Sequence, residues 1–188
     1  SLTTANTLNT EDPMSAGSVV FNPNFLQVAA DGRPAGAKAM YGSSTASTVG
    51  YSGASSNGVL KLAHGTDPTL GVGFNAFPIN PGAKYKFAIR LKQSSAAGSG
   101  LYIRVAEKDS ELSNGKTHLS SNATGETGVE QGNRSVQTNT GNSSTGIGRL
   151  TNVNIDGTDV SSLENIAVTT GYRVIQGIYT PNSTAKYA

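Results

Sequence analysis

Residues 77–92 read FPINPGAKYKFAIRLK, and this stretch decides the fold class. After the Pro81-Gly82 turn, apolar side chains occupy every second position: Tyr85, Phe87, Ile89 and Leu91. Such alternation predicts a β-strand with one buried face. The positions between them are Lys84, Lys86, Ala88, Arg90 and Lys92. We therefore expect a strand over residues 84–93 whose second face is basic.

Similar strand patterns lie on both sides of this stretch, separated by turns rich in Gly, Pro, Ser and Asp. The clearest are residues 59–63, 70–79, 101–107 and 172–180. Shorter strands are expected at 19–21, around Met40-Tyr41, at 149–153 and at 164–168, with a single helical turn at 160–164. The 23 glycines and the lack of any sustained amphipathic helical run favour short strands and many turns. Strands at this spacing without intervening helices predict an all-β fold, an antiparallel sandwich or barrel.

The chain reads as one domain with a tail. Residues 1–17 are polar and lack periodicity, so we expect an extended N-terminal arm. Residues 18–188 would form the β domain, with a loop-rich insert at 108–165 that holds a few short strands or edge segments. The chain begins at Ser1 and stops where another strand would start, so we expect a processed chain or a fragment.

Composition excludes several function classes. Charged residues make up 14% of the chain and the formal net charge is +2, which argues against a dedicated nucleic-acid binder. There is no cysteine, so disulfides, thiolate metal sites and cysteine nucleophiles are excluded. No apolar stretch approaches the roughly 20 residues of a membrane-spanning helix. Stability must come from the core or from other copies of the chain, and we expect a homo-oligomer.

The outer face of the sheet is the candidate binding surface. If Leu101, Ile103 and Val105 face the core, Tyr102 and Arg104 face outward beside the cations of residues 84–92. In the last strand, Tyr172, Val174 and Ile178 would point inward. The predicted surface therefore comprises Tyr102, Arg104, Arg90, Lys86, Arg173 and Tyr179. Tyrosine rings with arginines suit sugar binding, whereas the alternatives are a solvated sheet face or one covered by a neighbouring subunit.

Catalytic and metal signals are weak. The two histidines, His64 and His118, are each expected in a polar turn without ligand spacing, and Walker-type or Gly-x-Ser-x-Gly motifs are absent. The alternating carboxylates Glu107, Asp109 and Glu111 could line a glycosidase cleft. Glu107 and Asp109 could instead hold a structural calcium ion. A solvated strand end is the interpretation we favour, with no cofactor required.

The order of motifs resembles the jelly-roll carbohydrate-binding modules, which have a galactose-binding-like β-sandwich. The motifs are NPNF at 22–25, DGRPAG at 31–36, VLKL at 59–62 and PGAKYKF at 81–87. The likeness covers residues 19–107 and resumes at 172–188, where 179–188 look like the module's penultimate strand and turn. Two features depart from it: Ala37-Lys38-Ala39 stands where the modules carry a tryptophan, and the 108–165 insert is long.

The resemblance, with the polar arm, also looks like pieces of tailed-phage virion proteins such as tail fibres or capsid decoration proteins. It implies a non-enzymatic virion or cell-surface module that attaches to glycans on a host surface. One alternative is a purely structural decoration or fibre-assembly protein without sugar binding, and another is a fragment of a glycan-active hydrolase. The expected partners are other virion or surface chains, further copies of this chain and cell-surface glycans, with no nucleic acid and no membrane insertion.

Overall fold

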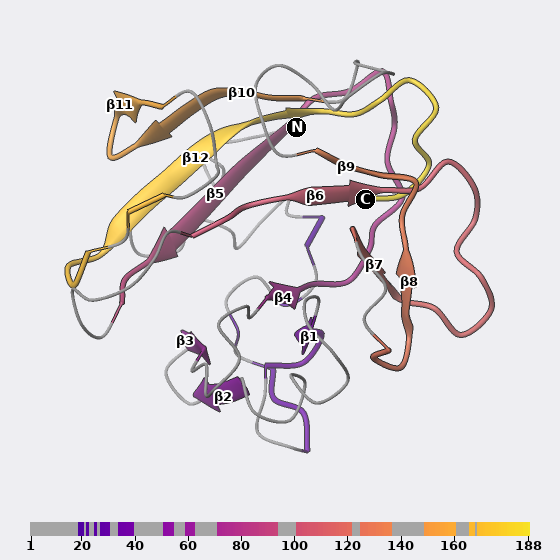
Figure 1. Ribbon diagram of the computed structural model, residues 1–188, viewed down its shortest axis with the longest axis horizontal. Coiled ribbons are helices and arrows are strands. Elements are labelled where there is room, and N and C mark those ends of the chain that lie inside the picture. Colours follow the sequence, from indigo (N-terminus) through magenta and orange to yellow (C-terminus); the bar gives the residue numbers. More distant parts are fainter. Residues whose placement is uncertain are drawn as a thin grey trace.

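The computed structural model describes residues 19–20, 22, 25, 27–30, 34–39, 51–54, 59–62, 71–93, 101–121, 125–136, 149–160, 166–167 and 169–188. Its strands are β1 Lys38–Ala39, β2 Tyr51–Ala54, β3 Val59–Leu62, β4 Val72–Gly73, β5 Tyr85–Leu91, β6 Val105–Glu107, β7 His118–Ser120, β8 Val129–Gln131, β9 Arg134–Val136, β10 Arg149–Ile155, β11 Thr158–Asp159 and β12 Arg173–Thr180. No helix occurs among the described residues. The all-β prediction is confirmed (Figure 1).

The largest sheet has four antiparallel strands in the order β11-β10-β12-β5. The long yellow strand β12 lies between β10 and β5 in Figure 1. Its register with β5 runs from Arg173 opposite Leu91 to Tyr179 opposite Tyr85. The expected strands at 84–93, 149–153 and 172–180 are therefore present as β5, β10 and β12.

A close contact between Gly177 and Phe87 determines which face of β12 packs against the core. The two residues are directly opposite in the register. A Cβ atom on Gly177 would lie 2.7 Å from the Cζ atom of Phe87 and 3.1 Å from a Val153 methyl carbon. The absence of a side chain at Gly177 lets the Phe87 ring cross the strand, which is the usual reason for a glycine inside a strand.

The remaining strands are short. β6 pairs with β9 and β1 with β4, both antiparallel, whereas β7 and β8 form a parallel pair. The 59–63 prediction is confirmed as β3, which pairs with β2. Only parts of two other expected strands form ladders: β4 within 70–79 and β6 within 101–107. The 108–165 segment contains β7 to β11, which is more strand than we expected there.

Some expected elements are absent or fall outside the described residues. Val19 and Val20 lie in no strand, so that prediction is wrong for these two residues. Of the predicted strand at 164–168 only residues 166 and 167 are described, and there Ile166 forms a bridge with Leu101. The arm at 1–17, Met40-Tyr41 and residues 161–164 of the helical turn lie outside the described residues.

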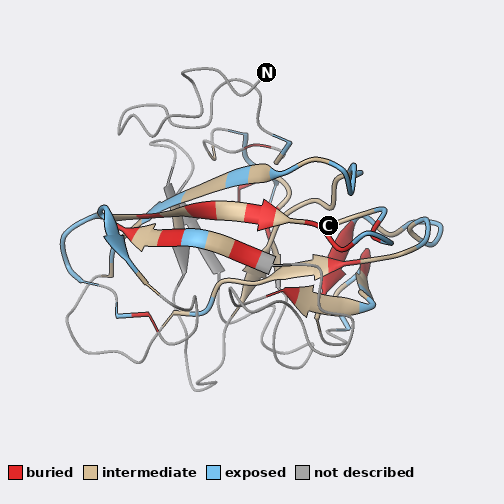
Figure 2. Cartoon of the chain, turned by 90° about the horizontal axis from the view of Figure 1, so that it is seen from above, coloured by how far each residue is buried: buried red, intermediate tan, exposed pale blue. Residues whose placement is uncertain are grey.

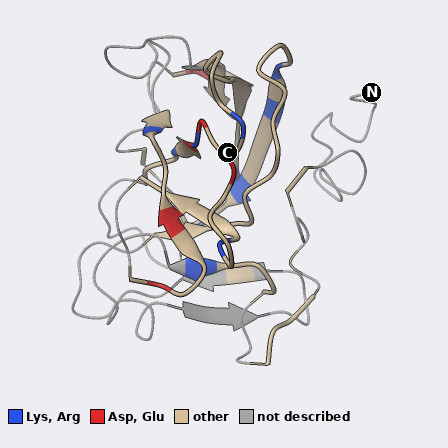
Figure 3. Ribbon diagram, turned by 90° about the vertical axis from the view of Figure 1, so that its right-hand side faces the viewer, with Lys and Arg blue, Asp and Glu red and all other residues tan. Residues whose placement is uncertain are grey.

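The core lies between the four-stranded sheet and the strands beside it. Its buried members are Val136, Leu150, Val153, Ile155, Ile166, Ile175 and Tyr179. Leu101, Ile103 and Val105 pack against this cluster, as the alternation predicted, and so do Tyr85, Phe87 and Leu91. Ile89 is the exception in β5, with 38% of its surface exposed. Figure 2 shows buried residues along the long strands and near the C-terminus, and Figure 3 shows how few described positions carry charge.

The C-terminal residues are held by backbone hydrogen bonds on two sides. Phe77 and Ala188 exchange N–H···O bonds of 2.9 and 3.1 Å. On the other side, the Lys108 N–H donates to the Tyr187 carbonyl at 2.9 Å, and the Lys186 N–H donates to the Lys108 carbonyl at 2.7 Å. The end of the chain therefore lies between the 77–79 segment and the end of β6 (Figure 1).

Candidate functional site

The structure separates the residues of the predicted binding surface. Lys86 and Arg90 are exposed on one face of β5, opposite Ile178 and Val174 of β12. We expected the 101–107 strand beside them, and that adjacency is wrong, because β12 occupies the place next to β5 and β6 pairs with β9. Tyr102 is 52% exposed, and the Arg104 guanidinium lies 5.4 Å from its ring centroid.

Tyr179 is a correction to the predicted surface. It is only 2% exposed and belongs to the core, where its ring lies 6.1 Å from that of Tyr85. The face assignment of β12 was wrong because both faces of this strand carry apolar residues. Ile175, Gly177 and Tyr179 are the buried positions, whereas Val174 and Ile178 are half-buried.

Tyr172, which we expected to point inward, is 43% exposed and lies at the centre of a group of cations. The guanidinium carbon of Arg90 lies 3.9 Å from the Tyr172 ring centroid, and the Lys92 ammonium nitrogen lies 4.8 Å from it. Both distances are within the range of cation–π attraction. We call Arg90, Lys92 and Tyr172 the Tyr172 cluster.

The register of the sheet explains how the Tyr172 cluster forms. Leu91 and Arg173 are the last pair of the β5–β12 ladder, so Lys92 and Tyr172 lie just beyond it. Arg90 and Lys92 alternate with Leu91 and therefore share one face of the strand. Sequence reasoning missed Lys92 and Tyr172. The charge alternation of residues 84–92 contained the signal for Lys92, whereas finding Tyr172 required the register.

Arg173 belongs to a different contact. Its Nε donates to the Asp156 carboxylate at 2.8 Å, and the second Asp156 oxygen accepts from the Val174 N–H at 2.9 Å. These hydrogen bonds lower the pKa of Asp156, the Val174 bond most. The predicted site residue Arg173 is therefore paired with a carboxylate on the β10–β11 turn. No salt bridge among the described residues includes Arg90 or Lys92.

The carboxylates predicted near 107–111 are held in a buried network. Glu107 has no exposed surface. One of its oxygens accepts from the Arg134 Nε at 2.7 Å. The other accepts from the Tyr179 hydroxyl and from the Asn182 N–H, the latter at 2.9 Å. Burial, reinforced by this hydrogen bond, raises the pKa of Tyr179 and keeps its hydroxyl protonated as the donor.

The same guanidinium also binds Asp109. The Arg134 Nη1 donates to one Asp109 oxygen at 2.9 Å, and its Nη2 donates to the other. The Thr184 hydroxyl donates at 2.9 Å to an Asp109 oxygen and accepts from Arg134 at 3.0 Å. We call Glu107, Asp109, Arg134, Tyr179, Asn182 and Thr184 the Glu107 network. It joins β6, β9 and the C-terminal segment.

This network differs from both chemical hypotheses for the carboxylates. Both oxygens of Glu107 are engaged inside the protein, so neither is directed at a substrate. The Arg134 guanidinium occupies the place between the carboxylates that a calcium ion would need. In the described part of the chain, no group of three or more His, Asp or Glu side chains could hold a metal ion. Glu111 instead accepts from the Tyr187 hydroxyl at 2.9 Å.

Asp109 should make folding sensitive to acid. Hydrogen bonding from Arg134, with a smaller contribution from Thr184, lowers the pKa of Asp109 despite the opposing effect of burial. Its stabilising contribution is present above the unfolded pKa near 3.8 and is lost as the pH falls through the lower folded value. We expect urea denaturation, followed by circular dichroism, to show stability declining below about pH 4. The decline should be shallower in Asp109→Asn, and equal slopes would contradict this role.

His118 is buried in β7 and not in a polar turn, which corrects the sequence interpretation. It is 2% exposed, with its Nε2 2.5 Å from the Gly36 carbonyl and its Nδ1 2.7 Å from the Thr117 hydroxyl. Burial lowers the pKa of His118 although the Gly36 contact opposes it. These contacts connect β7 to the 34–39 segment, so His118 has a structural role. His64 lies outside the described residues.

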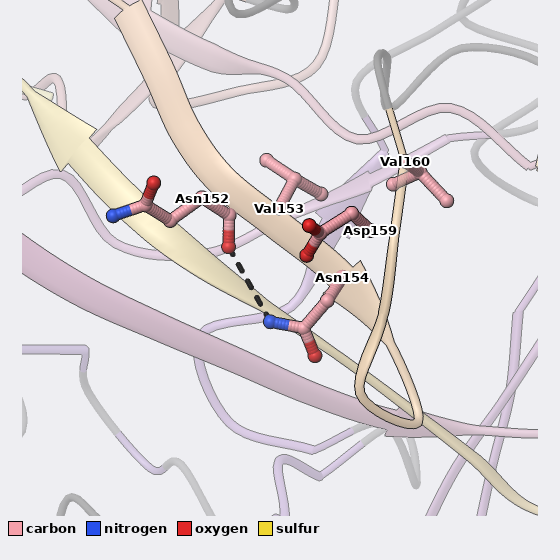
Figure 4. Close-up of a pocket in the computed structure, with 5 residues that line it drawn as sticks. All are labelled: Asn152, Val153, Asn154, Asp159 and Val160. Atoms are coloured by element: carbon pink, nitrogen blue, oxygen red, sulfur yellow. Dashed lines mark hydrogen bonds between the residues drawn. The ribbon is translucent and has the colours of Figure 1, made fainter.

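A shallow polar groove lies between β10 and β11 (Figure 4). It is lined by Asn152, Val153, Asn154, Asp159 and Val160. The Asn154 amide is engaged within the protein: its nitrogen donates to the Asn152 carbonyl at 3.3 Å, and its oxygen accepts from Gln176 at 3.1 Å. The Asn152 side chain points away from Asp159 and Val160 in Figure 4. These contacts stabilise the irregular turn, so the groove is a weaker candidate than the Tyr172 cluster.

Comparisons with known proteins add no family to this geometry. None of the described residues forms a helix long and apolar enough to cross a membrane. No protein-family model matches the chain, and searches of curated proteins and of solved structures found no similar protein.

Proposed function

We propose that the protein is a non-catalytic attachment module that binds glycans through exposed tyrosines and cations, on the surface of a virion or a cell. The virion setting follows from the sequence resemblance alone. The observation that carries the binding proposal is the Tyr172 cluster, an exposed aromatic residue with two cations that have no carboxylate partner among the described residues.

The chemistry of this cluster suits a sugar. Arginine and lysine donate hydrogen bonds to hydroxyl and ring oxygens, and a tyrosine edge offers both apolar contact and a hydroxyl. Tyr102 with Arg104 repeats the pairing of an exposed ring with a cation. The residues lie on or beside strands, which hold binding groups more rigidly than long loops do.

The fold and the carboxylates fit a module of this kind. The core receives side chains both from the four-stranded sheet and from β6, β9 and residues 101–105, which supports two packed layers. We propose that these layers form a jelly-roll β-sandwich. The engagement of Glu107 and Asp109 by Arg134 supports attachment rather than glycan hydrolysis, because hydrolysis needs two carboxyl groups at a substrate.

A glycan array tests the attachment proposal. We expect the protein to bind a subset of glycans and Tyr172→Ala to lose most of that signal, with an unchanged circular dichroism spectrum. Tyr102→Ala measures whether the second pair belongs to the same site. Complete absence of glycan binding by the folded wild-type protein would refute the proposal.

Assembly without sugar binding is the second candidate, and Ile89 favours it. This side chain is 38% exposed on β5, and among the described residues β5 is the last strand at one side of its sheet. Edge strands with exposed apolar residues are common sites of association between chains. We expect sedimentation to show an oligomer that Ile89→Glu dissociates, if this face is an interface. A monomeric wild-type protein would exclude the assembly function.

A further inference from the structure

We propose that the Tyr172 cluster binds the carboxylate or sulfate group of an acidic saccharide. This inference rests on the proposed function and gives its ligand a chemical class. Its starting point is that the exposed ring already has a cation at 3.9 Å and another at 4.8 Å. In this arrangement the Tyr172 ring positions Arg90 and Lys92, and these two cations bind the ligand.

The stacking of Arg90 leaves its hydrogen-bond donors available. A guanidinium that lies over an aromatic ring uses its face for the cation–π contact, while its N–H bonds lie in its own plane. That planar fork matches two oxygens of a carboxylate or sulfate group. Lys92 adds a second positive charge from the same face of the strand, so an oxyanion can be bound by both.

The sheet holds the backbone at Arg90 by hydrogen bonding. Arg90 lies within the β5–β12 ladder, opposite Val174, and β12 is itself paired with β10 on its other side. Tyr172 restricts the Arg90 side chain, which otherwise has many rotamers. The cluster is therefore arranged before the ligand binds, and preorganisation of this kind reduces the entropy cost of binding.

The charges around the cluster favour one isolated anionic group over a polyanion. Arg173 follows Tyr172 in the chain and is paired with Asp156, so a carboxylate lies close to the cluster. The whole chain, Arg90 and Lys92 included, has a net charge of only +2. A nucleic acid needs a longer basic track along its phosphates. The cations Arg90 and Lys92 therefore suit a saccharide that presents a single acidic group, since the neighbouring Arg173–Asp156 pair has no net charge.

Matched ligand pairs and variants test this inference. The probes are galacturonic acid and its methyl ester, galactose 6-sulfate and galactose, and a single-stranded oligothymidylate, each measured by calorimetry on the full chain. We expect an acidic member to bind at least about tenfold more tightly than its neutral parent, as charge-assisted hydrogen bonds predict. Which of the two pairs shows the difference identifies the anionic group.

The variants locate the effect. Arg90→Gln and Tyr172→Leu should each weaken acidic-saccharide binding about tenfold. The control is Lys86→Gln, which removes one charge from the same face of β5 outside the cluster and should leave binding nearly unchanged. An equal loss in Lys86→Gln would show diffuse attraction and overturn the defined site.

The other outcomes separate the inference from the proposed function. Equal binding of acidic and neutral saccharides would overturn the inference and leave glycan attachment standing. No binding of any saccharide here or on the array would overturn both. Tighter binding of the oligothymidylate, lost in Arg90→Gln, would assign the cluster to nucleic acid and overturn the inference.

Discussion

Replacing Arg134 with methionine should lower the free energy of unfolding by about 3–5 kcal/mol, the usual cost of leaving a buried charge without its partner. Glu107 is completely buried, and Arg134 is the cation bonded to it. Methionine keeps most of the volume of arginine but none of its charge. Urea denaturation followed by circular dichroism at neutral pH measures the change.

Two further variants show whether charge is the cause. Arg134→Met combined with Glu107→Gln should recover part of the loss, because the buried group is then neutral. Arg173→Met breaks the other arginine–aspartate pair, whose side chains are 31% and 47% exposed, and should cost a small fraction as much. Equal losses in Arg134→Met and Arg173→Met would contradict the buried network as a major contributor.

The second large effect is expected at Gly177. A Cβ atom there would lie 2.7 and 2.9 Å from two Phe87 ring carbons, closer than packed atoms approach. Gly177→Ala should therefore force the ring or β12 to shift and cost about 1–3 kcal/mol or more, as overpacking does in well-packed cores. The same denaturation measurement gives the value.

Gly171 supplies the matched control for Gly177. Nothing lies within 4 Å of a Cβ atom at Gly171, so Gly171→Ala should be neutral or slightly stabilising. The double variant Phe87→Leu with Gly177→Ala replaces the ring by a smaller side chain. It should lose less free energy of unfolding than the two single changes added together. A Gly177→Ala protein as stable as Gly171→Ala would show that the ring has room to move.

Local patterns predicted the strands but not their partners. The alternation in residues 84–92 was enough to place β5 and three of its core residues, because that signal is contained within one strand. Pairing of β5 with β12 joins residues far apart in the chain, and no local pattern records it. The binding surface was therefore assembled from the wrong neighbours.

The faces of β12 show a second limit. In the run RVIQGIYT each face contains two large apolar or aromatic residues, so hydrophobicity alone does not select the buried one. The close contact of Gly177 with Phe87 determines which face is buried, and this contact forms only in the tertiary structure. Arg134 was missed for a similar reason. It stands in the polar run Gly132-Asn133-Arg134-Ser135, and only folding brings it to Glu107.

The position of β5 at the side of the sheet also has a consequence during synthesis on the ribosome. β5 is complete long before its partner β12 emerges, because residues 92–172 lie between the two strands. Throughout that interval an apolar strand is present without its ladder, the condition in which nascent chains associate wrongly. Lys86 and Arg90, exposed on that strand, would then oppose strand-to-strand contact between nascent chains by charge repulsion.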